Sequence, residues 1–236
     1  HTPTCGAMGM IAIGAGGLDV AVAMATGKYY LQCPTVVKVN LVGKKAPWVS
    51  AKDIILYILQ QLTVKGGVNK IIEYTGEGIS SLSLTDRATI CNMGAELGAT
   101  TSIFPTDKRT KEYLQQQGRV EDYVEIKADE DAVYDQELTV DLSALVPMTA
   151  KPHSPDAVVP VKELEGMKIN QVVIGSCTNS SFADMMKAAK ILKGRKVAEH
   201  VSLVIAPGSS SILAMLAKNG ALGDMVQAGA RILECG

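Results

Sequence analysis

The stretch VVIGSCTNSSFADM, residues 172–185, decides the fold of the C-terminal part of the chain. Its apolar run 172–174 ends at a glycine, as a buried strand does, and the polar residues around Cys177 lead into a helical pattern at 183–192. The same kinds of pattern predict strands at 201–205 and 230–233 and a helix at 212–218. This order indicates a βαβαβ unit with a parallel sheet and right-handed crossovers.

Residues 1–117 show a comparable alternation of strand and helix patterns, and two signals there open helices. Ser50–Asp53 and Ser83–Asp86 are capping boxes, in which a serine and an acidic residue bond each other's backbone N–H groups. The apolar stripe 54–62 follows the first box, and the helix behind the second is predicted to extend to Leu97. Further helices are predicted at 18–24 and 108–117, and strands at 31–41, 70–75 and 101–104.

The region 118–166 has a different character, because charges and prolines interrupt every periodicity. Only residues 137–142 alternate well, and we expect an isolated strand there within a connector. The sequence therefore predicts an α/β protein of two lobes with mainly parallel sheets. The lobes are 1–117 and 167–236, the second being the βαβαβ unit.

Composition excludes several classes of function. The 236 residues carry a net charge of −1, which provides neither the basic surface of a dedicated nucleic-acid binder nor a polybasic membrane patch. Charged residues and glycines break the apolar stretches before the roughly 18 residues that a membrane helix needs. No signal peptide is visible, and both ends of the sequence suggest a segment of a larger protein.

The five cysteines, at positions 5, 33, 91, 177 and 235, are too scattered for a disulfide framework and favour a reducing compartment. Cys177 and Cys235 follow the first and third strands of the βαβαβ unit. The carboxyl ends of parallel strands meet at one edge, where ligands bind. A thiol placed before a helix ionises more easily, because the helix N-terminus and free backbone N–H groups lower its pKa. The hydroxyl and amide groups of residues 178–181 can also donate hydrogen bonds to the sulfur. Spacing alone still favours two small buried apolar residues, since a third metal ligand is missing.

Several motifs together make the chain similar to the aconitase family, which also includes isopropylmalate and homoaconitate dehydratases. The segment 172–185 resembles a signature of that family, and HTPTCGAMGMIAIGAGG (1–17) resembles the segment that follows an Asp-Ser pair. ATICNMGAELGATTSIFP (88–105) is similar to another family segment. ILECG (232–236) matches the start of a Cys-Gly-Pro-Cys motif. The matches run in order along nearly the whole chain.

The resemblance implies a 4Fe–4S cluster held by three cysteines. Two of them map onto Cys177 and Cys235, and the third would lie beyond residue 236. The resemblance also implies that one iron has no protein ligand and acts as a Lewis acid on the substrate. It assigns Asn92 and Asn179 to the surroundings of the cluster.

His1 and Glu96 are the remaining candidates that the resemblance implies. In the family a histidine at this place lies at the substrate, and a glutamate pairs with it. Asn92 and Glu96 are four apart on the predicted helix, on a different face from its apolar stripe. A carboxylate beside an imidazole fixes its tautomer and favours its charged form. Without the resemblance, a solvated Glu96 and a frayed terminal His1 would be the preferred interpretation.

The function implied is the interconversion of citrate and isocitrate through cis-aconitate, with a tricarboxylate or dicarboxylate hydroxy acid as the substrate class. An isopropylmalate or homoaconitate dehydratase large subunit is the alternative. A non-catalytic α/β binding module, or a cluster-free RNA binder, is the rival of another class. The remaining domains of the parent enzyme are the expected partners, in the cytoplasm or the mitochondrial matrix. We expect these residues alone to be inactive, because the third cluster cysteine and the family's arginines and serine base are missing.

Overall fold

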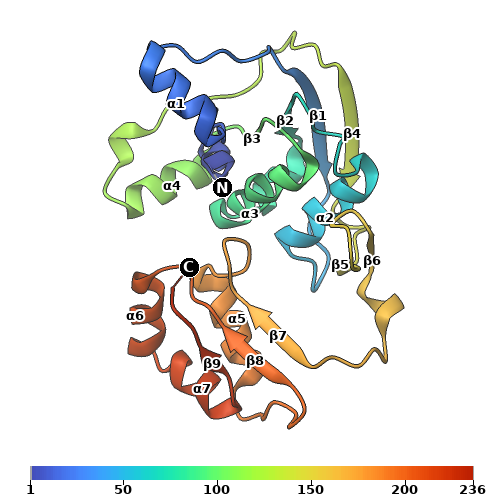
Figure 1. Cartoon of the computed structure of the whole chain (residues 1–236), viewed down its shortest axis with the longest axis vertical. Coiled ribbons are helices and arrows are strands. Elements are labelled where there is room, and N and C mark those ends of the chain that lie inside the picture. Colours follow the sequence, from blue (N-terminus) through green and yellow to red (C-terminus); the bar gives the residue numbers. More distant parts are fainter. Residues whose placement is uncertain (1, 236) are drawn as a thin grey trace. The chain divides into compact units, whose positions relative to one another are not determined.

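The computed structural model describes residues 2–235 and divides into two compact units, the first extending to Glu163 and the second beginning at Leu164. Each unit is built on a parallel sheet of its own (Figure 1). A short antiparallel hairpin is added to the first unit. The predicted α/β class with mainly parallel sheets is confirmed.

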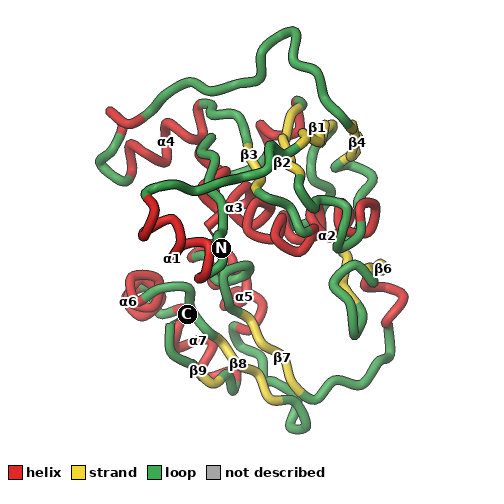
Figure 2. The backbone as a smooth tube through the Cα atoms, turned by 45° about the horizontal axis from the view of Figure 1, so that its top comes forward, coloured by secondary structure: helices red, strands yellow, loops and turns green. Residues whose placement is uncertain are grey.

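The sheet of the first unit has the order β3-β2-β1-β4, and every pair in it is parallel. Its strands are β1 (Thr35–Val42), β2 (Lys70–Thr75), β3 (Thr101–Ile103) and β4 (Gln136–Asp141). Val39 is in register with Tyr74 on one side and with Leu138 on the other. The expectation of an isolated strand at 137–142 is therefore wrong. Parallel strands need a long crossover, which the loop from α4 to β4 provides (Figure 2).

The helices of the first unit begin where the sequence signals predict. They are α1 (Gly17–Thr26), α2 (Ala51–Leu62), α3 (Leu84–Met93) and α4 (Lys108–Gln116), with the 3₁₀ segments η1 (Thr2–Met8), η2 (Glu77–Ser81), η3 (Gly94–Leu97) and η4 (Val120–Asp122). Both capping boxes form, and Ser50 donates its backbone N–H to Asp53 Oδ2 over 2.7 Å. The helix predicted to reach Leu97 tightens into η3 after Met93 and ends at Gly98, which has a left-handed φ of 73°.

The core of the first unit lies between the sheet and the helices α2 and α3. The apolar stripe predicted at 54–62 provides Ile54, Ile55, Ile58 and Leu59, all completely buried against Val37, Val39 and Leu41 of β1. The crossovers from β1 to β2 and from β2 to β3 carry α2 and α3, and the two helices contact each other. Crossovers between parallel strands are almost always right-handed, which places both helices on one face of the sheet.

A hairpin of β5 (Met148–Ala150) and β6 (Val158–Pro160) completes the first unit, before the 3₁₀ segment η5 (Val161–Leu164). Asp53 links the hairpin to α2, because its Oδ1 accepts the backbone N–H of Met148 over 2.6 Å. The prolines in this region had predicted irregular structure only.

The second unit contains the predicted βαβαβ order with one addition. Its elements are β7 (Gln171–Ile174), α5 (Phe182–Leu192), β8 (Ser202–Ile205), α6 (Ser210–Lys218), α7 (Ala221–Ala228) and β9 (Arg231–Ile232). The strand order is β7-β8-β9, all parallel. The second crossover thus holds two helices, and the sequence analysis had predicted only the first. Each helix contributes one completely buried side chain to a core that it shares with β8. These side chains are Met185 of α5, Leu216 of α6 and Met225 of α7.

In the described part of the chain, the helices are all too short or too polar to cross a membrane.

Candidate functional site

Cys177 and Cys235 lie at the same edge of the β7-β8-β9 sheet. Ile174 of β7 is in register with Ile205 of β8, which is in register with Ile232 of β9. Each cysteine follows its own isoleucine by three residues, so both have passed the strand ends by the same length of chain. The outer strands are about 10 Å apart, because neighbouring strands are spaced by about 4.8 Å. Both side chains are exposed thiols. This is the placement that the strand pattern predicted.

A tight turn holds the backbone around Cys177. A Cβ atom at Gly175 would lie 2.5 Å from the carbonyl oxygen of Ala206, so the end of β7 packs directly on the backbone that follows β8. Ser176 has a φ of 65°, which is uncommon for a non-glycine residue. Its Oγ lies 3.6 Å from the Sγ of Cys177, in hydrogen-bond contact. The thiol therefore sits on a constrained turn rather than on a loose loop.

The loops after β7 and β8 lie against each other at this edge. Gly208 donates its backbone N–H to the carbonyl oxygen of Ser180, and a Cβ atom on Gly208 would lie only 2.4 Å from Ser180 Oγ. Ser181 and Ser209 cap α5 and α6, respectively, by accepting backbone N–H groups through Oγ. Asn179, half-buried, lies within this packed layer and donates its backbone N–H to Gly175. Ser209 is therefore a helix cap.

In the first unit, Asn92 and Glu96 lie at the C-terminal end of α3 and in η3. Asn92 is 3% exposed, whereas Glu96 is exposed. Thr4 Oγ1 donates a hydrogen bond to Asn92 Oδ1 over 3.3 Å, and η1 packs along α3. The sequence analysis predicted that Asn92 and Glu96 lie on a different face of the helix from its apolar stripe. Glu96 is exposed, unlike the buried Ile90 and Leu97, which confirms this for Glu96. Asn92, in contrast, is itself buried.

His1 lies outside the described residues. The segment that follows it is anchored, because Phe104 donates its backbone N–H to Gly6 and Thr101 donates its hydroxyl to Ala12. The sequence analysis did not single out Thr4 as a partner of Asn92. No signal in a single sequence relates two residues that are 88 positions apart.

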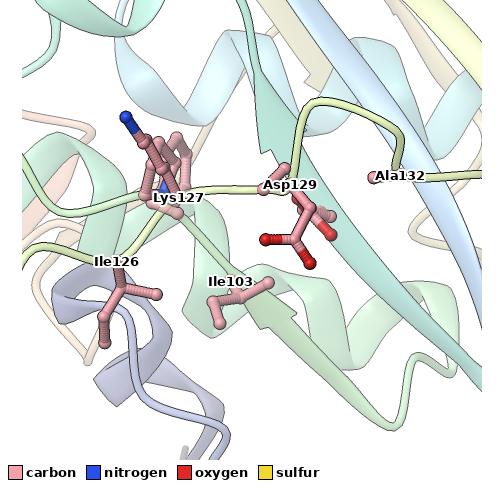
Figure 3. A pocket seen from close by; sticks show the side chains of 9 residues that line it. Ile103, Ile126, Lys127, Asp129 and Ala132 are labelled. Atoms are coloured by element: carbon pink, nitrogen blue, oxygen red, sulfur yellow. The ribbon is translucent and has the colours of Figure 1, made fainter.

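Two other features of the first unit complete the inventory. Cys91 is buried, and burial raises the pKa of its thiol far above the ordinary value, which agrees with a structural role. A pocket of about 250 Å³ lies between β3 and the segment 126–132, with Lys127 and Asp129 in its lining (Figure 3). The sequence analysis did not predict this pocket.

The residues of the second unit fit two ligands of an iron–sulfur cluster. Cysteine thiolates are the usual ligands of such clusters, and hydrogen bonds to the sulfur tune them. Cys177 and Cys235 are exposed at one edge, and Ser176 contacts the first of them. Among residues 2–235, no group of three or more His, Cys, Asp and Glu side chains is arranged to hold a metal ion.

Comparison with known proteins identifies relatives along the whole chain. The model of the aconitase family (aconitate hydratase) matches residues 1–166 and 161–236. The 3-isopropylmalate dehydratase large subunit of Clostridium kluyveri is 44% identical over 230 residues, covering 98% of this chain and 54% of its own length. A second such subunit, from Archaeoglobus fulgidus, is 42% identical, covering 100% of this chain and 57% of its own length.

The mitochondrial aconitate hydratase of Schizosaccharomyces pombe is 44% identical over 256 residues, covering 100% of this chain and 32% of its own length. The chain thus spans about half the length of the dehydratase subunits that it matches, and a third of this hydratase. Family match, identity and the parallel α/β units agree: the chain belongs to the aconitase family.

Proposed function

We propose that the chain is part of an iron–sulfur hydro-lyase that interconverts citrate and isocitrate through cis-aconitate. The observation that carries this proposal is the matched position of Cys177 and Cys235, each three residues beyond strand residues in one register. Two exposed thiols at the carboxyl edge of a parallel sheet lie where such folds bind their ligands.

Cys177 and Cys235 would hold the cluster together with a ligand from the rest of the parent protein. When bound, the cluster supplies a Lewis acid that favours the loss of hydroxide from the substrate. The turn at Gly175 and Ser176 fixes the direction in which Cys177 leaves the strand. The packed loops after β7 and β8 make this edge rigid, and rigidity is what a preorganised ligand set requires.

Glu96 and Asn92 would serve the substrate side of the same reaction. The exposed carboxylate of Glu96 can accept a hydrogen bond from the imidazole of His1 and hold it in one tautomer. The buried amide of Asn92 has a fixed orientation, because its Oδ1 accepts the hydroxyl of Thr4. Asn92 lies in α3 and Glu96 in η3, and the C-terminal end of each element is closed by backbone hydrogen bonds. Neither side chain is therefore carried by a loop.

Citrate is the first candidate substrate because residues 88–105 and the stretch TVKGG at 63–67 resemble true aconitases. Isopropylmalate is the second candidate. It is favoured by the relatives from Clostridium kluyveri and Archaeoglobus fulgidus, which are named 3-isopropylmalate dehydratase large subunit and are matched over more than half their length.

We also propose that residues 1–117 carry the end of the first family domain and the second domain, and that 167–236 begin the third. The exposure of α1 supports a missing part of the first of these domains. None of its residues is buried, and Leu18 and Met24 are 79% and 82% exposed. An apolar helix in water is stabilised by burial against another element, which the longer parent protein would supply.

The test uses the full-length parent protein, reconstituted anaerobically with iron and sulfide. The visible absorbance of the cluster should be lost or bleach rapidly in Cys177→Ser and Cys235→Ser. It should be unchanged in Cys33→Ser, which removes another exposed thiol. The reconstituted native protein should turn over citrate in preference to isopropylmalate.

Two results separate the parts of the proposal. Normal absorbance in both cysteine variants would overturn the cluster assignment. Turnover of isopropylmalate alone would leave the hydro-lyase chemistry in place and replace the substrate with the second candidate.

A further inference from the structure

We propose that Ser102 is a positioning residue for Glu96 and for the segment that follows His1. The inference rests on the proposed hydro-lyase function, in which Glu96 and His1 act as a pair. Ser102 lies in β3 and is completely buried, so it acts through the segments that pack on it and not on the substrate itself.

The Ser102 side chain lies directly against the first residue of η3. A Cβ atom at Gly94 would lie 2.3 Å from Ser102 Oγ and 3.5 Å from Ser102 Cβ. Gly94 has ordinary helical angles, with φ −57° and ψ −26°, which alanine adopts without strain. The obstacle to a side chain at position 94 is therefore the Ser102 hydroxyl and not the backbone conformation of Gly94.

The backbone of Ser102 lies against η1. A Cβ atom at Gly6 would lie 1.7 Å from the carbonyl oxygen of Ser102, and Phe104 donates its backbone N–H to Gly6 over 2.9 Å. One residue of β3 thus sets the distance from the sheet of two segments. These are η1, which begins directly after His1 in the sequence, and η3, which contains Glu96.

The other end of η3 is fixed as well, so a movement at Gly94 must displace Glu96. Leu97 is completely buried, and its carbonyl oxygen accepts the backbone N–H of Gly67 over 2.9 Å. Glu96 lies between these two contacts and is exposed. A push on Gly94 away from β3 would turn this short segment about Leu97 and change the direction of the Glu96 carboxylate.

The Ser102 hydroxyl is better explained as a spacer than as a hydrogen-bonding group. The Tyr74 phenol, whose pKa is raised by burial, lies nearby, and the Ser102 hydroxyl opposes that rise. Within residues 2–235, however, neither hydroxyl has a hydrogen-bond partner of ordinary geometry. A buried hydroxyl without a partner costs free energy of folding, because its bonds to water are lost. Stability therefore does not explain this side chain, whereas the spacing of η3 from β3 does.

The experiment moves one heavy atom from residue 102 to residue 94 in the full-length, cluster-loaded parent protein. The variants are Gly94→Ala, Ser102→Ala and the double variant Gly94→Ala/Ser102→Ala. In the double variant the new Cβ atom takes the space of the lost oxygen and lies 3.5 Å from the Cβ atom of residue 102, an ordinary van der Waals distance. The values of kcat and KM are measured per cluster-loaded protein with citrate and with isopropylmalate, and unfolding is followed in urea.

The expected pattern is a loss of kcat that the second substitution reverses. In Gly94→Ala, kcat should fall about tenfold with little change in KM, because Glu96 is displaced from the histidine. Ser102→Ala should lower kcat about threefold, since η3 can then approach β3, while the urea midpoint stays nearly unchanged. In the double variant, kcat should return to within about twofold of the native value. Lower kcat at unchanged stability is a result that a purely structural role of Ser102 does not give.

Gly78→Ala is the matched control. A Cβ atom at Gly78 would lie 2.9 Å from the carbonyl oxygen of Leu41 and 2.9 Å from Leu142 Cδ1, so this variant also crowds the first unit. Gly78 lies in η2, which follows the carboxyl end of β2, whereas η3 precedes the amino end of the parallel strand β3. The control should therefore lose stability and keep the native kcat.

The failures of this inference and of the proposed function are distinguishable. If the native protein is active, a native kcat in Gly94→Ala overturns the positioning role, as does a double variant no more active than Gly94→Ala. An equal fall of kcat in Gly78→Ala also overturns it, because lost stability would then explain both variants. If the reconstituted native protein turns over neither citrate nor isopropylmalate, the proposed function itself fails, and this inference fails with it.

Discussion

Thr4 donates its hydroxyl to Asn92 Oδ1 over 3.3 Å and so ties the first turn of η1 to the last turn of α3. The bond sets the orientation of the amide, because the oxygen of Asn92 faces Thr4 and its nitrogen faces the other way. A buried amide with a fixed orientation can present one hydrogen-bonding group in a constant direction. Thr4 is therefore a positioning residue for Asn92.

Replacement of Thr4 tests this relationship. Thr4→Val keeps the shape and removes the hydroxyl, which should cost about 1 kcal/mol of stability. Under the proposed function it should also lower kcat of the parent protein by about tenfold, with a smaller change in KM. Thr4→Ser restores the donor and should recover most of kcat. Equal kcat values for the three proteins would contradict the positioning role.

Gly6 is predicted to be the least replaceable glycine of the N-terminal segment. Gly6→Ala places a Cβ atom 1.7 Å from the backbone oxygen of Ser102, so η1 must move away from β3. We expect a loss of about 3 kcal/mol in the free energy of unfolding, measured by urea denaturation. The matched control is Gly14→Ala, since a Cβ atom at Gly14 meets nothing within 4 Å. Equal stability of the two variants would show that η1 is loosely attached.

The sequence predicted most strands and helices because their signals are local. Capping boxes at Ser50 and Ser83 and the stripe at 54–62 involve only neighbouring residues, and all of them form. The pairing of β4 with β1 was missed because its partner residues are about 100 positions away, as Val37 and Gln136 are. The helix α7 was missed because Gly220 and Gly223 resemble loop residues, although Gly220 merely precedes the helix.

The candidate site was predictable only where strand topology determines it. Parallel order placed Cys177 and Cys235 at one edge without any knowledge of side-chain positions. The bond from Thr4 to Asn92 and the contact of Gly175 with Ala206 depend on packing between distant segments. Such contacts leave no periodic pattern in one sequence.

Gly175 provides a test of the edge that carries Cys177. Gly175→Ala should force the end of β7 away from Ala206, whose oxygen would lie 2.5 Å from the new Cβ atom. We expect slower cluster reconstitution and faster bleaching in the parent protein, followed by visible absorbance. Gly223→Ala in α7 is the control, because its Cβ atom meets nothing within 4 Å and alanine favours the helix by about 0.5–1 kcal/mol. Normal loading of Gly175→Ala would show that this contact does not shape the site.

The ion pair of Arg87 and Asp107 should make the first unit sensitive to acid. Arg87 is completely buried and donates two hydrogen bonds to the carboxylate, over 2.6 and 3.1 Å. Burial alone would raise the pKa of Asp107, but the Arg87 guanidinium and backbone N–H groups hold that pKa below its ordinary value. Because the pKa of Asp107 is lowered in the folded protein, the ion pair contributes its full stabilisation of the fold at pH values above the unfolded-state pKa of about 3.9. This stabilisation is lost as the pH falls through the folded-state pKa.

Asp107→Asn isolates that ion pair, because asparagine still caps α4. We expect a loss of about 3 kcal/mol at neutral pH, since a buried guanidinium is left without its counter-charge. The difference from the native protein should narrow as the pH falls below about 4, because Asp107 is protonated first in the unfolded chain and then, at its lowered pKa, in the folded protein. Asp122→Asn, which breaks an exposed pair with Arg119, should cost less than about 1 kcal/mol. Urea denaturation across pH 3–7 checks both variants, and a difference that stays constant with pH would contradict the ionic origin of the stabilisation.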